Sequence, residues 1–321
     1  LMLLVAHVGL PYFLLSSTGP LVQSWYSRTA PGSPYRLYAI SNIGSLAALL
    51  SYPLLFEPQF ATSTQSWIWS AGFLIFAVLC FAAARGFSLH AQAAERSPTP
   101  DDDAPTAHFS PQRVAAWILL PALGSCALLA VTARISQDIA VSPFMWVAPL
   151  SLYLLTFIVC FDRELWYRRL PTATLLGFSV LGVCVVMLAD EIEQVYSAAG
   201  IPLRIGHFDN NVVFETASGF AMLFLACMVC HGEVVRLKPP PRHLTAFYLC
   251  IAAGGALGGL LVGVVCPLTF SFIAEWHAVL LAAFLLAVSV TLHEMWRLRS
   301  DCKPASTGEK SSPRNRDVQP Q

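Results

Sequence analysis

The sequence predicts an all-α protein, a polytopic membrane bundle of about nine transmembrane helices, on three observations. Of the 321 residues, 56% are hydrophobic and only 12% are charged, whereas soluble domains carry about 25% charged residues. Apolar stretches close to the roughly 20 residues that a membrane-spanning helix needs recur along the whole chain. The 19 Lys and Arg residues are concentrated in alternate loops between these stretches. Lipid must therefore cover the excess apolar surface.

Each apolar stretch is expected to be a helix, because backbone polar groups find no water partners in lipid. Several tryptophans fall near the expected span ends, where an interfacial aromatic belt would place them; they are Trp67, Trp69, Trp146, Trp276 and Trp296. In chain order, the expected spans are 1–19, 37–56, 66–84, 114–133, 143–161, 172–189, 212–231, 244–266 and 276–294.

The loop charges predict an orientation in the membrane. The odd-numbered loops and the C-terminal tail hold 17 Lys and Arg residues, and the even-numbered loops hold only Arg134 and Arg204. Cytoplasmic loops retain Lys and Arg, so the C-terminus is expected in the cytoplasm, in a bacterial inner membrane. Residue 1 then faces outward. Because the chain opens inside an apolar run at Leu1 with no basic flank, we expect a further helix upstream.

Composition divides the chain into four segments. Residues 1–90 are expected to form a three-helix membrane segment and 113–296 a six-helix segment. Residues 91–112 are polar, Pro-rich and acidic, as expected of a flexible cytoplasmic linker. Residues 297–321 have no apolar periodicity and are expected to be a disordered basic tail. Such a tail either fixes topology or touches anionic lipid. Net charge is zero, and we expect no nucleic-acid partner.

A glycine-rich face marks the eighth span. GxxxG spacing lets a neighbouring helix approach closely, because glycine has no side chain. The face predicts tight helix packing, with a sliding surface in a transporter-like machine as the alternative. Its members are Gly254, Gly255, Gly258, Gly259 and Gly263.

Ionisable residues at membrane depth are costly and are candidates for function. Arg134 and Asp138 are four residues apart, so they can pair on a helix, as an interfacial salt bridge or as part of a substrate site. Glu215 opens the seventh span and His7 lies within the first. A proton-relay role for Glu215 stays open beside a structural one.

The run from Cys227 to His231 spells CxxCH, the pattern of c-type haem attachment. It falls inside an expected helix at its cytoplasmic end, where haem is not attached. We therefore expect no cofactor and no metal ion, and we interpret the cysteines as small buried residues. The sequence contains no P-loop, HExxH or GxSxG motif, so no catalytic residue is assigned.

The connection between the seventh and eighth spans carries His231, Glu233, Arg236 and Arg242. Glu233 and Arg236 are three residues apart and can pair, and Pro239–Pro241 stiffen the turn. This pattern predicts a rigid helical hairpin, or a docking surface for a cytosolic partner.

Three stretches resemble the membrane domain of bacterial fused major-facilitator/spermidine synthase-like proteins. They are GPL through YRLYA, SNIGS and SYP in 19–53, DIA with WVAPL and LYLLTF in 138–157, and CHGE with RL, PRHLT, FY and the glycine-rich span in 230–263. The resemblance implies a major-facilitator-like fold. It also implies a cytosolic aminopropyltransferase-like domain after the membrane part, which this sequence lacks. No catalytic residue transfers from it, so whether the chain takes part in an enzyme stays open.

The sequence supports three hypotheses about function. The first is a transporter-like or sensing inner-membrane module that handles a small solute such as a polyamine. The second is a non-transporting anchor for a spermidine synthase-like enzyme. The third is a structural subunit of a membrane complex. The scarcity of intramembrane carboxylates argues against a polyamine site.

Overall fold

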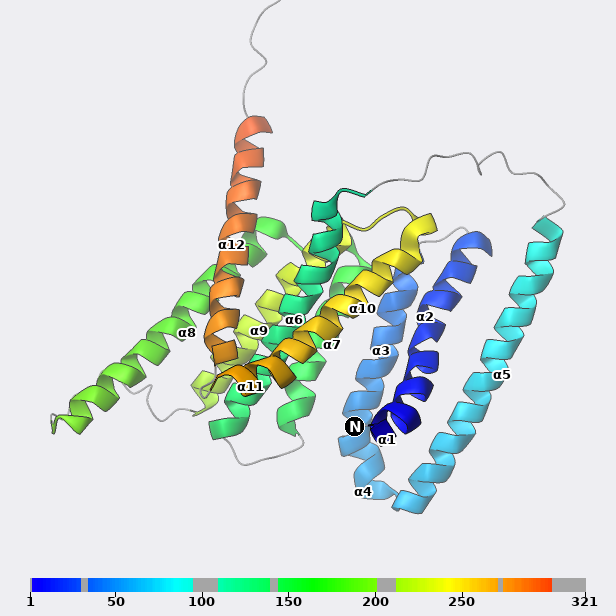
Figure 1. Ribbon diagram of the computed structural model, residues 1–321, viewed down its shortest axis with the longest axis horizontal. Helices are drawn as coiled ribbons and strands as arrows, with labels where there is room; N and C mark the ends of the chain where they lie inside the picture. Colours follow the sequence, from blue (N-terminus) through cyan, green and yellow to red (C-terminus); the bar gives the residue numbers. More distant parts are fainter. Residues whose placement is uncertain are drawn as a thin grey trace, which may run out of the picture.

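The computed structural model in Figure 1 describes residues 2–29, 34–94, 109–138, 144–200, 212–270 and 274–301. Every element in these ranges is helical. The α-helices are α1 (Met2–Leu4), α2 (Leu10–Thr29), α3 (Tyr35–Ser51), α4 (Glu57–Gln59), α5 (Thr62–Ala94), α6 (Pro111–Asp138), α7 (Phe144–Asp162), α8 (Arg169–Ala198), α9 (Val212–Arg236), α10 (Leu244–Leu260), α11 (Cys266–Thr269) and α12 (Ala274–Asp301). Short π-helical turns at Val5–Gly9, Tyr52–Phe56 and Leu261–Val265 join some of them, and 3-10 turns form at Glu164–Trp166 and Pro241–His243.

Within the described ranges, eight helices are long and apolar enough to cross a membrane. The expected fold class, an all-α polytopic bundle, is therefore confirmed. The first expected span, 1–19, is also helical from Met2 onward, but it is not among these eight. Its helix continues to Thr29 through a polar stretch, in which Ser16 and Ser17 bond back to carbonyls one turn earlier.

The helices extend beyond the segment boundaries expected from composition. α5 continues to Ala94 and α6 begins at Pro111, so both ends of the 91–112 linker are helical. α12 runs to Asp301, five residues into the expected tail at 297–321. Residues 95–108 and 302–321 lie outside the described residues.

Successive helices alternate in direction, so the Lys- and Arg-rich connections meet at one end of the bundle (Figure 1). We call it the hairpin end, because the α9–α10 connection lies there. The N-terminal ends of α3, α6 and α8 and the C-terminal ends of α7, α9 and α12 lie on this side (Figure 1). Arg134, near the C-terminal end of α6, lies at the opposite end.

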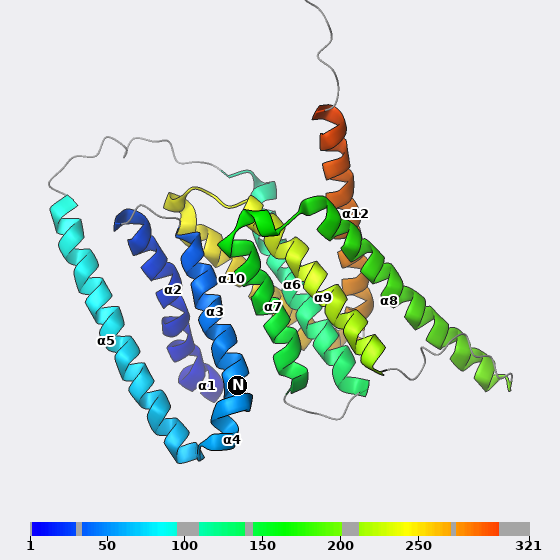
Figure 2. The same ribbon diagram turned by 180° about the vertical axis from the view of Figure 1, so that it is seen from behind.

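α6, α7, α9 and α10 form the centre of the bundle, with α8 and α12 together on one side and α2 and α5 on the other (Figure 2). The core between them includes the fully buried side chains of Trp117, Leu176, Leu223 and Phe247. No residue in the apolar window of α5 is buried. Exposed apolar surface on this scale is unfavourable in water and fits a lipid environment.

Aromatic side chains of α3 join the first helices to the rest of the bundle. Tyr38 stacks on Tyr248 of α10, with 4.9 Å between ring centroids, and also contacts Phe161 of α7. The Tyr35 hydroxyl donates a hydrogen bond to the Pro239 carbonyl. α3 therefore shares one core with α7 and α10, although the linker separates their sequences.

The glycine-rich face brings α10 against α6 at two of its five positions. A Cβ atom on Gly254 would lie 2.2 Å from the Ile118 carbonyl oxygen, and one on Gly258 would lie 2.4 Å from that of Ala122. A Cβ atom on Gly255 would be in ordinary contact range of Ser125, whereas one on Gly259 or Gly263 would have no described atom of another element within 4 Å. The closest approach of the two helices thus depends on Gly254 and Gly258.

Candidate functional site

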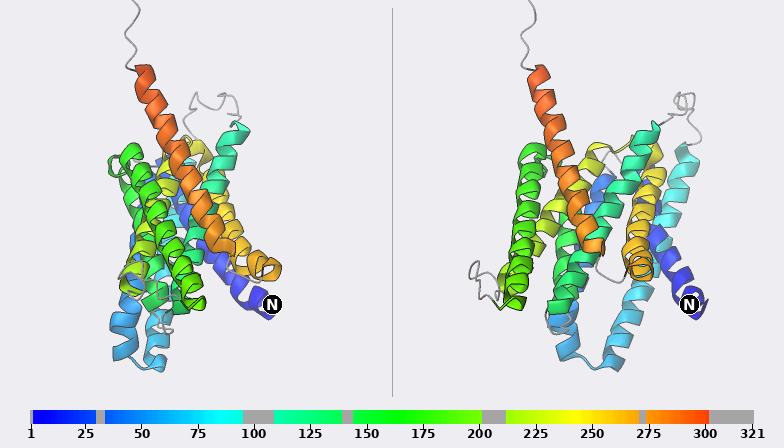
Figure 3. Two further views of the ribbon diagram at one scale, coloured as in Figure 1. Left: turned by 90° about the vertical axis from the view of Figure 1, so that its left-hand side faces the viewer. Right: turned by 60° about the vertical axis from the view of Figure 1, so that its left-hand side comes forward.

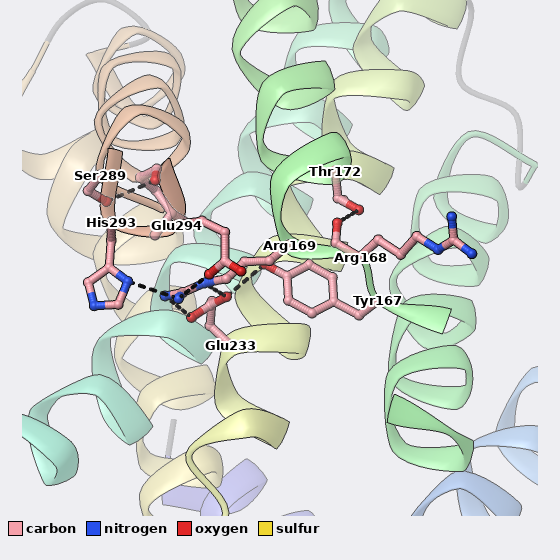
Figure 4. A network of polar contacts seen from close by, with 9 residues as sticks. Tyr167, Arg168, Arg169, Thr172, Glu233, Ser289, His293 and Glu294 are labelled. Atoms are coloured by element: carbon pink, nitrogen blue, oxygen red, sulfur yellow. Dashed lines mark hydrogen bonds and ion pairs between the residues drawn. The ribbon is translucent and has the colours of Figure 1, made fainter. Parts of the chain in front are cut away.

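A buried ion network at the hairpin end is the most developed polar site in the described part of the chain (Figure 4). The Arg169 guanidinium donates from Nε to Glu233 Oε1 at 2.8 Å and from Nη2 to Glu233 Oε2 at 2.9 Å. Its Nη1 lies 3.0 Å from Glu294 Oε2 and 3.0 Å from His293 Nδ1. One arginine therefore binds α9 and α12 to the start of α8.

The chemistry of arginine suits this position. Its planar guanidinium carries five donors in a fixed fork, which matches a carboxylate at two points and leaves further donors for other partners. The side chains of Arg169, Glu233 and Glu294 are 14%, 10% and 16% exposed. Carboxylates so deeply buried need a cationic partner, because moving an unpaired carboxylate out of water costs several kcal/mol.

Tyr167 completes the network from the α7–α8 connection. Its hydroxyl donates to Glu233 Oε1 at 2.8 Å, and its ring lies where a Cβ atom on Gly232 would be, 2.4 Å from Cγ. Burial, and then the charge of Glu233, raise the pKa of the Tyr167 phenol well above its usual range. The hydroxyl therefore remains a donor throughout the neutral pH range.

Replacing Tyr167 by phenylalanine should lower the free energy of unfolding by about 1.5–3 kcal/mol, the range for a hydrogen bond to a charged group. The ring would still cover Gly232, and Arg169 would still hold Glu233. The raised pKa means that the folded state holds the phenolic proton more tightly than the unfolded state. The contribution of the protonated Tyr167 phenol to stability is therefore complete below about pH 10 and is lost as the pH rises further. Denaturant titrations of both proteins in detergent at neutral and alkaline pH would measure this. An equal stability at neutral pH would contradict it.

The α9–α10 connection is held by side chains from two other helices. The indole of Trp117 in α6 donates to the Leu237 carbonyl at 3.0 Å, and Tyr35 of α3 donates to Pro239. The ring of Phe109 packs edge-on against His243, with centroids 4.8 Å apart. These contacts restrain the turn in the described structure.

The expected pairing of Glu233 with Arg236 is not present. Glu233 is taken by Arg169 and Tyr167, and Arg236, the last residue of α9, is exposed beside a cavity. The side chain of Arg242 lies outside the described residues.

His231 lies fully buried two residues before Glu233 in α9. Its ring stacks on Phe157, and its Nδ1 is 2.9 Å from the Thr156 hydroxyl. That hydroxyl donates its proton to the Tyr153 carbonyl at 2.7 Å, so it accepts from His231 Nδ1–H. Among the described residues, His231 Nε2 has no hydrogen-bond partner, and it faces Gly124 and the Tyr153 ring. Cys227 and Cys230 are buried in the same helix. No metal-binding group of three or more ligands is found among the described residues.

The other intramembrane candidates lie at the opposite end of the bundle. Arg134 Nη2 donates to Glu215 Oε1 at 2.6 Å, joining α6 to α9. The pair lines a cavity of about 20 Å³ with Thr216, Ser218 and Trp276, room for about one water molecule. Asp138 ends α6, but its side chain lies outside the described residues. His7 is exposed, with Nδ1 2.9 Å from the Leu3 carbonyl.

Sequence reasoning placed His293 near a helix end, at the membrane interface, and did not single out Arg169, Tyr167 or Glu294. In the sequence, Arg169 is only one of several loop charges. Glu294 carried a usable signal, since a carboxylate near the end of an apolar span is expected to have a buried partner. Which cation would reach it depends on how α8 and α12 pack.

Comparison of the chain with known protein families, with characterised proteins and with solved structures finds no match. Function is therefore inferred from the geometry of the described residues and from the resemblance of the motifs.

Proposed function

We propose that the chain is a non-transporting membrane anchor, which holds an aminopropyltransferase-like enzyme at a fixed position on the cytoplasmic face of a bacterial inner membrane. The observation that carries this proposal is the Arg169 network, which clamps α8, α9 and α12 together where α12 leaves the bundle.

The C-terminal part of α12 rises above the neighbouring helices (Figure 3). His293 and Glu294 lie near the base of this projecting part, and residues 295–300 beyond them are exposed. A helix is stiff over a few turns, so a clamp at its base sets the direction of everything attached beyond it. This suits a module that positions a partner better than one that must rearrange.

The enzyme class comes from the resemblance alone, which implies an aminopropyltransferase-like domain on the cytoplasmic side. The assignment of the hairpin end to the cytoplasmic side rests on the Lys and Arg residues there. Anchoring needs no solute path, and the close α6–α10 contact at Gly254 and Gly258 agrees with a packed interior.

Fractionation of native cells tests the proposal. Aminopropyl transfer from decarboxylated S-adenosylmethionine to putrescine should sediment with the membranes, and should move to the soluble fraction when the gene for this chain is deleted. Complementation with Arg299→Pro, which breaks the projecting helix, should restore less membrane-bound activity than the matched Arg299→Ala. An unchanged distribution in the deletion strain would overturn the proposal.

Solute transport or sensing is the second candidate, because the Arg134–Glu215 pair lines an enclosed cavity between transmembrane helices. Such a pair at membrane depth is a functional candidate. At about 20 Å³ the cavity admits no polyamine, so transport would need a larger opening in another state. Arg134 also offsets the negative charge that a cationic solute would require.

Uptake of labelled putrescine into proteoliposomes distinguishes the two candidates. A transporter should show saturable uptake that Glu215→Gln abolishes, while Glu57→Gln, at an exposed carboxylate, should leave it unchanged. We expect no uptake above protein-free vesicles with the native chain, and saturable uptake would favour transport over anchoring.

A further inference from the structure

The hairpin end also contains a cavity that the ion network leaves open. Its volume is about 330 Å³, and it lies between the α7–α8 connection and the C-terminal end of α9. This is at the lower end of the usual range for ligand pockets, about 300–1,000 Å³. It is lined by Cys160, Tyr167, Gly232, Val235, Arg236 and Lys238.

The described residues of the lining include two cations and no carboxylate. The nearby acids are already engaged by arginines outside the pocket: Glu233 and Glu294 by Arg169, and Asp162 by Arg36 and Arg163. The side chain of Glu164 lies outside the described residues. The charged side chains that line the pocket in the described part of the chain are therefore both cationic.

Two side chains supply this charge in different ways. Arg236 is exposed and makes no ion pair or hydrogen bond in the described part of the chain. The Lys238 ammonium lies 5.4 Å from the centroid of the Tyr35 ring, a cation–π contact. The C-terminal end of α9 opposes an anion with about half a negative charge, which the full positive charge of the Arg236 guanidinium outweighs.

We propose that this pocket binds a phosphate group, held between Arg236 and Lys238 above the Tyr167 ring. A guanidinium fork and an ammonium are the side chains that bind phosphate oxygens in proteins. The Tyr167 ring is fixed by Gly232 and Glu233, so the floor of the pocket is preformed.

The depth of the site bears on the source of the phosphate. Arg236 ends the candidate span Val213–Arg236, which places the pocket at the level of lipid headgroups. Basic pockets between transmembrane helices bind anionic headgroups there. A soluble phosphate ester would present the same group from the aqueous side. The proposal does not depend on anchoring or on transport.

Binding to the purified chain in neutral detergent tests the site. The probes are dioctanoyl phosphatidylglycerol, dioctanoyl phosphatidylcholine as the matched zwitterion, glycerol 3-phosphate and inorganic phosphate. We expect saturable binding of the anionic lipid and weaker binding of phosphatidylcholine. The variant Arg236→Gln/Lys238→Gln should raise Kd about tenfold or more, while Arg297→Gln/Arg299→Gln, which removes two cations outside the pocket, should leave it nearly unchanged.

Competition separates the sources. Displacement of the lipid by glycerol 3-phosphate or inorganic phosphate supports a site for soluble phosphates, and displacement by anionic lipid alone supports a headgroup site. Equal affinity in the native chain and the Arg236/Lys238 variant, or no saturable binding of any phosphate probe, would overturn the proposal. If the double variant does not elute as a single species, Lys238→Gln alone should still raise Kd, and added salt should weaken binding to the native chain.

Discussion

Replacing Arg169 by methionine should lower the free energy of unfolding by about 3–5 kcal/mol, the cost of removing one partner from a buried ion pair. The change would leave Glu233 and Glu294, which are 10% and 16% exposed, without their shared cation. It would also remove the polar link between α12 and the helices α8 and α9, although apolar packing of α12 on α8 would remain. Denaturant titration in detergent, followed by tryptophan fluorescence, would measure the loss.

Two further variants separate stranded charge from lost packing. Adding Glu233→Gln and Glu294→Gln to Arg169→Met removes the uncompensated charges and should recover much of the stability, because replacing all members of a buried ion group is far less costly than breaking it. Arg168→Gln is the matched control, since this neighbouring side chain points away from the network in Figure 4. A loss as large in Arg168→Gln as in Arg169→Met would show that the network does not stabilise the fold.

Replacing Gly254 or Gly258 by alanine should destabilise the bundle by about 1–3 kcal/mol or more, the range for overpacking a close contact. The new methyl group would lie 2.2 Å from the Ile118 carbonyl oxygen or 2.4 Å from that of Ala122. Both of these obstacles are backbone atoms, so relief requires α6 and α10 to move apart. Thermal unfolding of the purified variants would measure the effect.

Gly259→Ala provides a control on the same helix, because nothing lies within 4 Å of a Cβ atom at this position. It should be neutral or stabilising by roughly 0.5–1 kcal/mol, since alanine loses less conformational entropy in a helix than glycine does. If Gly254→Ala and Gly259→Ala behaved alike, close packing of α6 on α10 would not explain the glycines.

The sequence predicted the glycine-bearing face but not the glycines that make contact. A GxxxG spacing repeats along one side of a helix whatever lies opposite, so all five positions were equivalent in the sequence. α6 crosses α10 near Gly254 and Gly258, and this crossing depends on the packing of the whole bundle.

The charged residues at the C-terminal end of α9 also show that local spacing does not predict which partner a side chain finds. Glu233 and Arg236 have the spacing of a helical ion pair, and the local pattern therefore predicted that they would pair. Arg169 is 64 residues earlier in the chain and binds both oxygens of Glu233. A bidentate pair in a buried site is stronger than an exposed pair on a helix surface. Glu233 therefore pairs with Arg169, and Arg236 faces the cavity instead.

The sequence by itself determined that the chain is helical, that its helices are long and apolar enough to cross a membrane, and that its cationic loops alternate along the chain. These properties depend on composition and on residues within a few positions of one another. Only the tertiary structure decided that Arg169 joins three helices, that Tyr167 covers Gly232, and that Arg236 and Lys238 line one pocket. Those contacts join residues far apart in the chain, and their distances are set by how whole helices pack rather than by any local pattern.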